Sequence, residues 1–388
     1  MTAALALLLL LSASSTGSRL SDDVLRVPQD APTIQAAVDA ATPGDLILVD
    51  RGTYPGVVVV PASKPNITIR GVDRNAVVLD GGDTQDNGIV VRADGVTLQN
   101  LSAHDFLKNG FYWEGVRGFT GSYLTVWNVL GYGIYAEGST DGLIEHDYVS
   151  GAADAAYYVG ECDPCRTTLR NLVARLSAVG YSGTNASGSL VIRDSLWDRN
   201  GAGILPNSYA NELDPPQSNA LIVGNSVAGT GRARVPLHTP LAGFYGIGIG
   251  IAGGNRNSVL GNTVTGSLRY GVAVFRTDHS IPPPPSVGEP WRPEGNAVRN
   301  NTVRQSGLAD LALSATARSG NCFRANRVAR TLPAKLQKRL CGRGGGDASV
   351  ARALEAPIQT MIARAMRVLR PIPYTAVPAP PPQPSWPG

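Results

Sequence analysis

The stretch NSVLGNTVTGSLRYGVAVF, from Asn257 to Phe275, decides the fold. Its β-branched residues alternate with polar ones in short runs, and this period of two predicts strands rather than helices. Asn and Gly separate the runs and supply the backbone conformations that tight corners need. Such a segment holds roughly three short strands, which cannot bury their apolar face alone. The segment must therefore stack on similar coils, at roughly 4.8 Å per layer.

The same unit recurs along most of the chain as a small residue followed by a larger, mostly apolar one. The first six copies are spaced by 22, 23, 23, 24 and 23 residues, and the later ones follow after longer gaps. The copies are Gly88-Ile89, Gly110-Phe111, Gly133-Ile134, Ala156-Tyr157, Gly180-Tyr181, Gly203-Ile204, Gly246-Ile247, Gly271-Val272 and, in weaker form, Ala309-Asp310-Leu311. A period in this range predicts a solenoid.

Asparagines occupy similar places in several copies. They are Asn100, Asn225, Asn262 and Asn301. Stacked Asn side chains can bond to one another along the axis of a solenoid. We therefore expect these residues to be structural rather than catalytic.

The N-terminal segment VPQDAPTIQAAVDAATPGDLILVDRGTYPGVVVV, from Val27 to Val60, resembles the opening of many right-handed parallel β-helix proteins of the pectin-lyase-like superfamily. The repeats are similar to those of NosD-like proteins. This resemblance, over roughly residues 25 to 330, implies an all-β right-handed parallel β-helix of about ten coils. Thr33 is placed to cap a helix through Ala41 that would cover the open end of the solenoid. A C-terminal helical appendage is expected as well.

Composition and local patterns divide the chain into five parts. Ala3 to Leu11 is an apolar run typical of an export signal and too short to span a bilayer, although no Lys or Arg precedes it. Val350, Leu354 and Ile358 begin an apolar face at helical spacing. The expected parts are a signal peptide (1–18), the β-helix (19–330), a disulfide-tied end with a Gly-rich linker (331–347), an amphipathic helical segment (348–370) and a Pro-rich disordered tail (371–388).

The charge and the cysteines narrow the class of protein. A net charge of +4 over 388 residues, with 16% charged residues, is not typical of a nucleic-acid-binding protein. Two local disulfides are the simplest pairing of the four cysteines, although the other connectivities stay open. The cysteines are Cys162, Cys165, Cys322 and Cys341. Together with the apolar N-terminal run they predict a secreted, periplasmic or cell-surface protein without a transmembrane segment.

Long insertions between the repeats are the best candidates for a functional site, because insertions at one corner of a solenoid stack on one side. Three stand out, at residues 205–219, 230–245 and 275–295, and the shorter loop 160–166 precedes them. As catalytic residues we predict Glu161, Asp163, Glu212, Asp214, His238 and His279. As substrate-binding residues we predict Tyr157, Tyr209, Tyr245, Arg276 and Trp291, because rings stack on sugars and polar groups bond to hydroxyls.

Structural alternatives to these assignments stay open. Glu161 and Asp163 could bind Ca²⁺ or exchange protons, or they could belong to a solvated turn. Glu212 and Asp214 would suit glycoside hydrolysis only at the right separation. The matching dipeptides His104-Asp105 and His146-Asp147 fit turn capping better than a shared metal site, because an intervening coil separates them.

The fold resemblance does not carry a known activity to this chain. The motifs of pectate lyases, polygalacturonases and pectin methylesterases are missing from the sequence, and Asp163-Pro164 lacks the His that follows in mannuronan epimerases. The leading expectation is an exported protein that binds or acts on an extracellular polysaccharide, with uronate polymers among the candidates, as a lyase or epimerase if it is catalytic. The alternative is a non-catalytic scaffold of NosD-like or adhesin-like type, whose C-terminal tail would bind a protein or surface partner.

Overall fold

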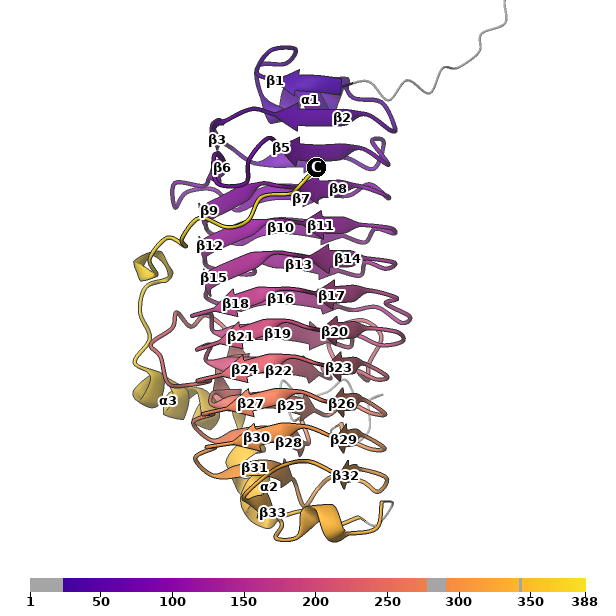
Figure 1. Ribbon diagram of the computed structural model, residues 1–388, viewed down its shortest axis with the longest axis vertical. Helices are drawn as coiled ribbons and strands as arrows, with labels where there is room; N and C mark the ends of the chain where they lie inside the picture. The colour runs from indigo at the N-terminus through magenta and orange to yellow at the C-terminus, as the bar shows by residue number, and fades with distance from the viewer. Residues whose placement is uncertain (1–23, 278–290, 342–343) are drawn as a thin grey trace, which may run out of the picture.

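The structure is a computed structural model that describes residues 24–277, 291–341 and 344–388. It is a rod of stacked coils in which each complete coil gives one strand to each of three parallel sheets (Figure 1). We name these sheet 1, sheet 2 and sheet 3, in the order in which the chain enters them. The expected all-β parallel β-helix is confirmed. Sheet 1 alone has 12 strands in the described residues, more than the ten or so coils expected.

Sheet 1 consists of β1 (Val24–Val27), β2 (Leu46–Val49), β5 (Thr68–Gly71), β8 (Thr97–Gln99), β11 (Thr120–Ser122), β14 (Leu143–Glu145), β17 (Thr168–Arg170), β20 (Val191–Arg193), β23 (Leu221–Val223), β26 (Ser258–Leu260), β29 (Ala297–Arg299) and β32 (Cys322–Arg324). Sheet 2 consists of β3 (Gly52–Pro55), β6 (Val77–Asp80), β9 (Ser102–Phe106), β12 (Thr125–Val129), β15 (Tyr148–Ala152), β18 (Val173–Arg175), β21 (Leu196–Asp198), β24 (Ser226–Ala228), β27 (Thr263–Thr265) and β30 (Thr302–Arg304).

Sheet 3 consists of β4 (Val58–Val60), β7 (Asn87–Val91), β10 (Asn109–Glu114), β13 (Ile134–Glu137), β16 (Ala155–Gly160), β19 (Val179–Thr184), β22 (Ala202–Asn207), β25 (Ile247–Ala252), β28 (Tyr270–Phe275), β31 (Ala309–Leu313) and β33 (Thr331–Leu332). The helices are α1 (Ile34–Ala40), α2 (Ala348–Leu354) and α3 (Ile358–Leu369), with 3₁₀ turns η1 (Pro240–Phe244), η2 (Leu336–Lys338) and η3 (Tyr374–Ala376).

The repeat found in the sequence is the register of sheet 3. Its apolar residues from Ile89 to Ile204 stand opposite one another in successive strands and point into the core. One copy was placed wrongly, because Ile249 and not Ile247 pairs with Ile204. The segment Gly246 to Ile249 repeats Gly-Ile twice, so its phase could not be read from the sequence.

The predicted asparagine ladder forms over the later coils. Asn225 donates from Nδ2 to Oδ1 of Asn262 at 3.0 Å, and Asn262 donates in the same way to Asn301 at 3.0 Å. Asn326 extends the ladder by one step. Asn100 does not belong to it, because it turns the chain with a φ of 60° and donates to the Gly71 carbonyl instead.

The N-terminal end of the solenoid is capped by a helix, whereas the C-terminal helices lie along its side (Figure 1). At the N-terminal end, the Thr33 hydroxyl caps α1 as predicted, and the helix buries Ile34, Ala37 and Val38. In the C-terminal half of the rod, α2 and α3 are separated at Pro357 and pack against the outer surface of the late coils. Residues 278–290 and the predicted signal peptide lie outside the described residues, and no described helix is long and apolar enough to cross a membrane.

The Pro-rich tail differs from the disordered segment that we expected. It runs back along the rod in an extended path, past β12 and β15, and ends near the N-terminal coils (Figure 1). Val377 is buried against the coil at Gly151, and Trp386 lies over the Arg70 guanidinium at 4.0 Å. Composition suggested disorder because Pro-rich chains lack a core of their own, but here the solenoid supplies the surface.

Candidate functional site

Two of the predicted long loops face each other across sheet 3. The loop after β22 leaves the edge of sheet 3 that leads to sheet 1, whereas the loop after β24 enters from sheet 2. We expected the insertions to share one corner, but these two loops do not. They wall sheet 3 from both sides, and a pocket of about 190 Å³ lies between them.

The pocket has a polar floor and mixed walls. The floor is made by Ser182 and Thr184 of β19 and by Asn207 of β22. The loop after β22 contributes Tyr209 and Glu212 to one wall, and the remaining lining residues are Tyr132, Asp154, Thr239, Pro240, Leu241 and Ile358. Ile358 begins α3, so the C-terminal appendage closes one side of the pocket.

A row of tyrosines leads away from the pocket along the outer face of sheet 3. Tyr112, Tyr135 and Tyr158 occupy matching positions in β10, β13 and β16. Tyr135 stacks on Tyr112 with ring centroids 4.6 Å apart and on Tyr132 with centroids 4.4 Å apart. We call these four residues the tyrosine strip. The rings of Tyr112, Tyr132 and Tyr135 are partly exposed, whereas Tyr158 is buried and its ring lies edge-on to that of Tyr135. The strip therefore offers a partly exposed aromatic surface next to the pocket.

Asp154 is the first of two unusual carboxyl groups in the pocket. It lies at the corner between β15 and β16 and accepts hydrogen bonds from Thr239 and Tyr132. Burial nevertheless dominates and raises the pKa of Asp154 to about 7. Its Oδ1 atom is shielded from solvent and has no hydrogen-bond partner among the described residues. One oxygen of this carboxyl group is therefore buried without a donor, which adds to the cost of ionising it.

Glu212 is the second carboxyl group. Its Oε2 atom accepts from the Tyr158 hydroxyl at 3.3 Å, and Thr184 bonds to the same carboxyl group. Burial and the negative charge of Glu161 together raise the pKa of Glu212 to about 7. A solvated glutamate has a pKa of about 4.3. Between that pH and about 7, Glu212 therefore keeps a proton that a solvated glutamate would release.

Glu161 and Glu137 extend the acidic character beyond the pocket. The Glu161 carboxyl accepts from the Leu213 backbone N–H at 3.3 Å and shares a hydrogen bond with Glu137. Burial and the neighbouring acidic groups raise the pKa of Glu161. Glu137 also accepts from Tyr112 of the tyrosine strip. No Lys, Arg or His lines the pocket in the described part of the chain.

Of the predicted catalytic residues, only Glu212 lines the pocket, with Glu161 beside it. Asp163 lies exposed in the disulfide-closed turn, and Asp214 is exposed at a left-handed position with a φ of 57°. His238 is exposed next to the pocket residue Thr239. His279 lies outside the described residues.

The predicted substrate-binding residues divide in the same way. Tyr209 lines the pocket. Tyr157 is wholly buried in the core against Trp197, because it occupies an inward position of β16, so this prediction was wrong. Tyr245 packs under α3 against Arg269, and Arg276 pairs with Glu355 at 3.6 Å.

Trp291 lies beside Gly253, where its carbonyl accepts from the Thr277 backbone N–H. Like Tyr245 and Arg276, it is not among the pocket-lining residues. The cysteine pairs form as the simplest reading suggested, as Cys162–Cys165 and Cys322–Cys341.

Sequence reasoning missed the tyrosine strip as a unit, and it missed Thr239. The signal for the strip was present in the repeat. The residue after each repeated apolar position points outward in a strand, and Tyr112, Tyr135 and Tyr158 stand there at 23-residue intervals.

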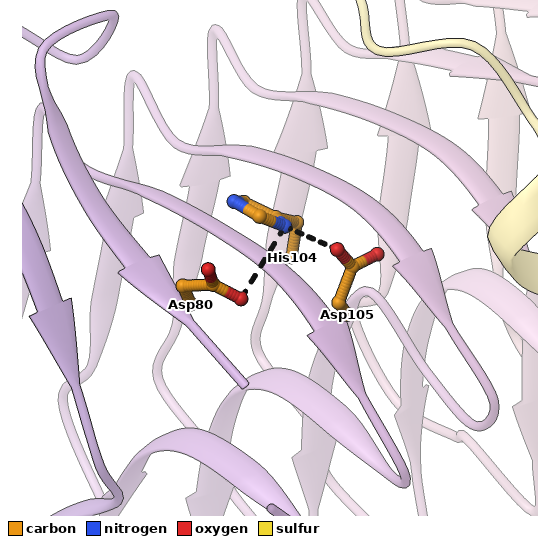
Figure 2. Close-up of side chains that lie close together, drawn as sticks. All are labelled: Asp80, His104 and Asp105. Atoms are coloured by element: carbon orange, nitrogen blue, oxygen red, sulfur yellow. Dashed lines mark hydrogen bonds and ion pairs between the residues drawn. The ribbon is translucent and has the colours of Figure 1, made fainter. Parts of the chain in front are cut away.

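One group of side chains in the described residues has the composition and spacing of metal ligands, and it lies outside the pocket. It consists of Asp80, His104 and Asp105 (Figure 2). Glu161 and Asp163, which we considered for Ca²⁺, do not form such a group.

Comparisons with known proteins agree with this architecture. Residues 109–283 match the family model described as "Right handed beta helix region". No curated protein sequence matches the chain significantly. The A-module of the mannuronan C-5 epimerase AlgE4 from Azotobacter vinelandii is similar in structure, with a TM-score of 0.53 and 15% identity, over 77% of this chain and 88% of that one.

The catalytic unit of a thermostable GH87 α-1,3-glucanase from Streptomyces thermodiastaticus is also similar, with a TM-score of 0.51 and 12% identity. This likeness covers 85% of the present chain and 73% of the glucanase. At such identities the likeness concerns the fold. The repeat register, the three parallel sheets and the matched region agree, and the chain is a right-handed parallel β-helix protein.

Proposed function

We propose that the pocket and the tyrosine strip bind an extracellular polysaccharide, and that Asp154 and Glu212 hydrolyse one of its glycosidic bonds. The observation that carries this proposal is the pair of carboxyl groups in one pocket, each with its pKa raised to about 7. Glycoside hydrolysis needs one protonated and one ionised carboxyl group beside the scissile bond. Two groups that titrate near neutral pH populate that combined state.

The chemistry of the pocket favours hydrolysis over the lyase or epimerase mechanism expected from the fold. A lyase or an epimerase removes a proton next to a uronate carboxylate, and it needs a base and a positive charge to stabilise the product anion. Tyr132 and Tyr158 are poor bases, because burial and nearby carboxylates raise both pKa values well above 10. The described lining contains no cationic side chain.

The same electrostatics indicates the class of substrate. Asp154 and Glu212, with Glu161 and Glu137 beside the pocket, would repel the carboxylates of a uronate polymer. An uncharged glycan avoids this cost and still contacts the exposed parts of the tyrosine strip. The pocket volume of about 190 Å³ lies below the usual range for ligand sites, roughly 300–1,000 Å³, and suits one sugar unit of a chain that continues over the strip.

Export remains part of the proposal. The two disulfides are compatible with an oxidising compartment, and the apolar N-terminal run has the pattern of a signal peptide. An extracellular location would bring the pocket to polymeric substrates.

The test is a polysaccharide screen on the purified protein, with and without Ca²⁺. Neutral glucans, galactans and xylans are compared with pectate and alginate, and both new reducing ends and unsaturated-uronate absorbance are followed. We expect reducing ends from a neutral polymer, without new absorbance. Asp154→Asn and Glu212→Gln should each abolish release, whereas Glu145→Gln, which removes a carboxylate paired with Arg170 on sheet 1, should not.

New unsaturated-uronate absorbance from pectate or alginate would instead establish a lyase and overturn the proposal of hydrolysis. Binding without turnover would contradict hydrolysis and favour a carbohydrate-binding protein. Silence across the panel would favour the non-catalytic scaffold.

A further inference from the structure

A second cluster of titratable side chains lies on sheet 2, at the edge where the chain turns toward sheet 3. Asp80 ends β6, and His104 stands opposite it in β9. Asp105 has a φ of 56°, which interrupts the alternation of the strand and brings its carboxylate to the same side as the His104 ring. Two adjacent coils thus present three potential ligand groups to one point (Figure 2).

The distances in the cluster suit a bound ion. Nδ1 of His104 lies 2.8 Å from Oδ2 of Asp105 and 3.8 Å from Oδ1 of Asp80. The three ligand atoms all lie within 4.8 Å of one another. Metal–ligand bonds of 2.0–2.2 Å would place neighbouring ligand atoms about 3.0–3.5 Å apart. One observed contact is slightly shorter than this range and the other slightly longer, so small side-chain rotations would complete the site.

The surroundings hold these groups in place. The His104 ring stacks on Trp127 with centroids 4.2 Å apart and planes at 18°. Oδ1 of Asp80 accepts from the Gly82 backbone N–H at 2.9 Å. Such outer contacts orient ligands before an ion arrives. The side chains remain partly open, from 17% exposed at His104 to 39% at Asp80, so solvent can reach the site.

The charges of the cluster are unbalanced. Asp80 and Asp105 form no ion pair with Lys or Arg among the described residues, and each is paired there with the His104 ring alone. The second oxygen of Asp105, Oδ1, is shielded from solvent and has no hydrogen-bond partner in the described part of the chain. Two carboxylates around one imidazole leave a net negative site when the ring is neutral.

We propose that Asp80, His104 and Asp105 bind a divalent metal ion of the Zn²⁺ class, through Nδ1 and one oxygen of each carboxylate, with water in the remaining positions. The imidazole ligand favours Zn²⁺, Mn²⁺ or Co²⁺ over Ca²⁺, which prefers oxygen ligands throughout. The site is separate from the pocket and does not depend on the proposed hydrolysis.

A bound ion would also fix the turn that receives the C-terminal tail. The Asp83 backbone N–H donates to the Asp105 carbonyl at 2.9 Å, and the Tyr374 hydroxyl donates to the Asp83 carboxylate at 2.8 Å. Binding to the folded state alone raises the melting temperature. Metal binding should therefore be visible in thermal unfolding as well as in a direct titration.

The experiment uses full-length protein without a His tag, freed of metal with a chelator and titrated with Zn²⁺, Mn²⁺ and Ca²⁺ by calorimetry. The same samples are melted, and the visible spectrum of a Co²⁺ complex is recorded. We expect one equivalent of Zn²⁺ to bind, and Co²⁺ absorption to show nitrogen and oxygen ligands. His104→Gln and Asp105→Asn should weaken binding by roughly tenfold or more.

His146→Asn is the matched control. His146 is also followed by an aspartate and stacked on an aromatic ring, that of Tyr123 at 4.7 Å, but it lies outside the cluster. Circular dichroism checks the fold of each variant, and Asp80→Asn, at the most exposed ligand, provides a second variant. Absence of Zn²⁺ binding to the unmodified protein, or equal losses in His146→Asn, would overturn the proposal.

Discussion

The hydroxyl of Tyr158 lies 3.3 Å from Oε2 of Glu212, although 54 positions separate the two residues in the sequence. Tyr158 belongs to β16 in sheet 3, and Glu212 belongs to the loop after β22. This contact joins the tyrosine strip to the carboxyl pair. It also favours the ionised form of Glu212, against the burial that disfavours it.

Replacement of Tyr158 by Phe should therefore shift the pH dependence of activity. Without the hydroxyl, the pKa of Glu212 should rise further, and the limb of the pH–rate profile that reports this group should move to higher pH. The measurement is kcat/KM against pH on the substrate that the screen identifies. Tyr181→Phe is the control, because it removes a buried hydroxyl that bonds only to the Val159 carbonyl. An unmoved profile in Tyr158→Phe would show that the contact does not tune Glu212.

The carboxyl pair should also make the fold less stable as the pH rises. Asp154 and Glu212 have native pKa values of about 7, above their unfolded values near 4, so the native state holds more protons between these limits. Stability is then greatest below about pH 4 for these two groups and declines as the pH rises through 7. The double variant Asp154→Asn, Glu212→Gln should flatten this decline in urea unfolding between pH 5 and 8. A decline of the same slope in the variant would assign the effect to other groups, such as the buried Asp147, whose pKa burial raises to about 8.

The fold could be predicted because a solenoid repeats its local rules. Alternation, corner residues and the 23-residue period all indicate one register, and Ile89 to Ile204 align in sheet 3 as that period requires. The predicted position of the repeat was wrong only at Ile247, where Gly-Ile recurs every two residues. The pocket was harder to predict, because its walls come from loops whose paths no period constrains.

The repeat could have placed some of these residues, but it could not place the C-terminal tail. Tyr157 and Tyr158 are adjacent and chemically alike, yet one is in the core and the other faces Glu212. Their order follows from strand parity, which the repeat already contained. The path of the tail did not follow from local pattern, because Trp386 lies 286 residues from its partner Asn100 and still farther from Arg70.

The tyrosine strip should contribute to binding rather than to bond cleavage. Tyr135 is its centre, stacked between Tyr112 and Tyr132, so Tyr135→Leu removes the aromatic surface while keeping an apolar side chain. We expect KM to rise about tenfold, equivalent to about 1.4 kcal/mol, with little change in kcat. Steady-state kinetics on a long and a short oligosaccharide would measure this. Tyr54→Leu, on β3 of sheet 2, is the control, and an equal effect there would indicate a general loss of stability.

The asparagine ladder should be a major source of stability in the late coils. Asn262 is fully buried, donates to the Ile222 carbonyl and to Asn301, and accepts from the backbone N–H and side chain of Asn225. Asn262→Ala would leave several of these groups buried without partners, at a cost of about 2–4 kcal/mol. Urea unfolding would measure the loss. Thr263→Ala, at the exposed neighbouring position, should cost less than about 0.5 kcal/mol.

The C-terminal tail should act as a part of the folded domain. The Trp386 backbone N–H donates to Asn100 at 2.9 Å, while its ring covers Arg70 at 4.0 Å. Farther inside, the buried Arg74 guanidinium donates to the Pro384 carbonyl at 2.9 Å. Removal of residues 371–388 would deprive that guanidinium of a partner and expose the surface that the tail covers, so the truncated protein should melt at a lower temperature.

Trp386→Ala should have a smaller effect, of about 1–2 kcal/mol, because it loses only the ring contact. Limited proteolysis then distinguishes detachment of the tail from a general loss of stability of the solenoid. In the unmodified protein the tail should resist cleavage, and in Trp386→Ala it should be cut first while the solenoid stays intact. Thr375→Ala, an exposed change in the same tail, should leave the digestion pattern as it was. Rapid cleavage of the tail in the unmodified protein would mean that it leaves the solenoid surface in solution, where it would again be available to a partner.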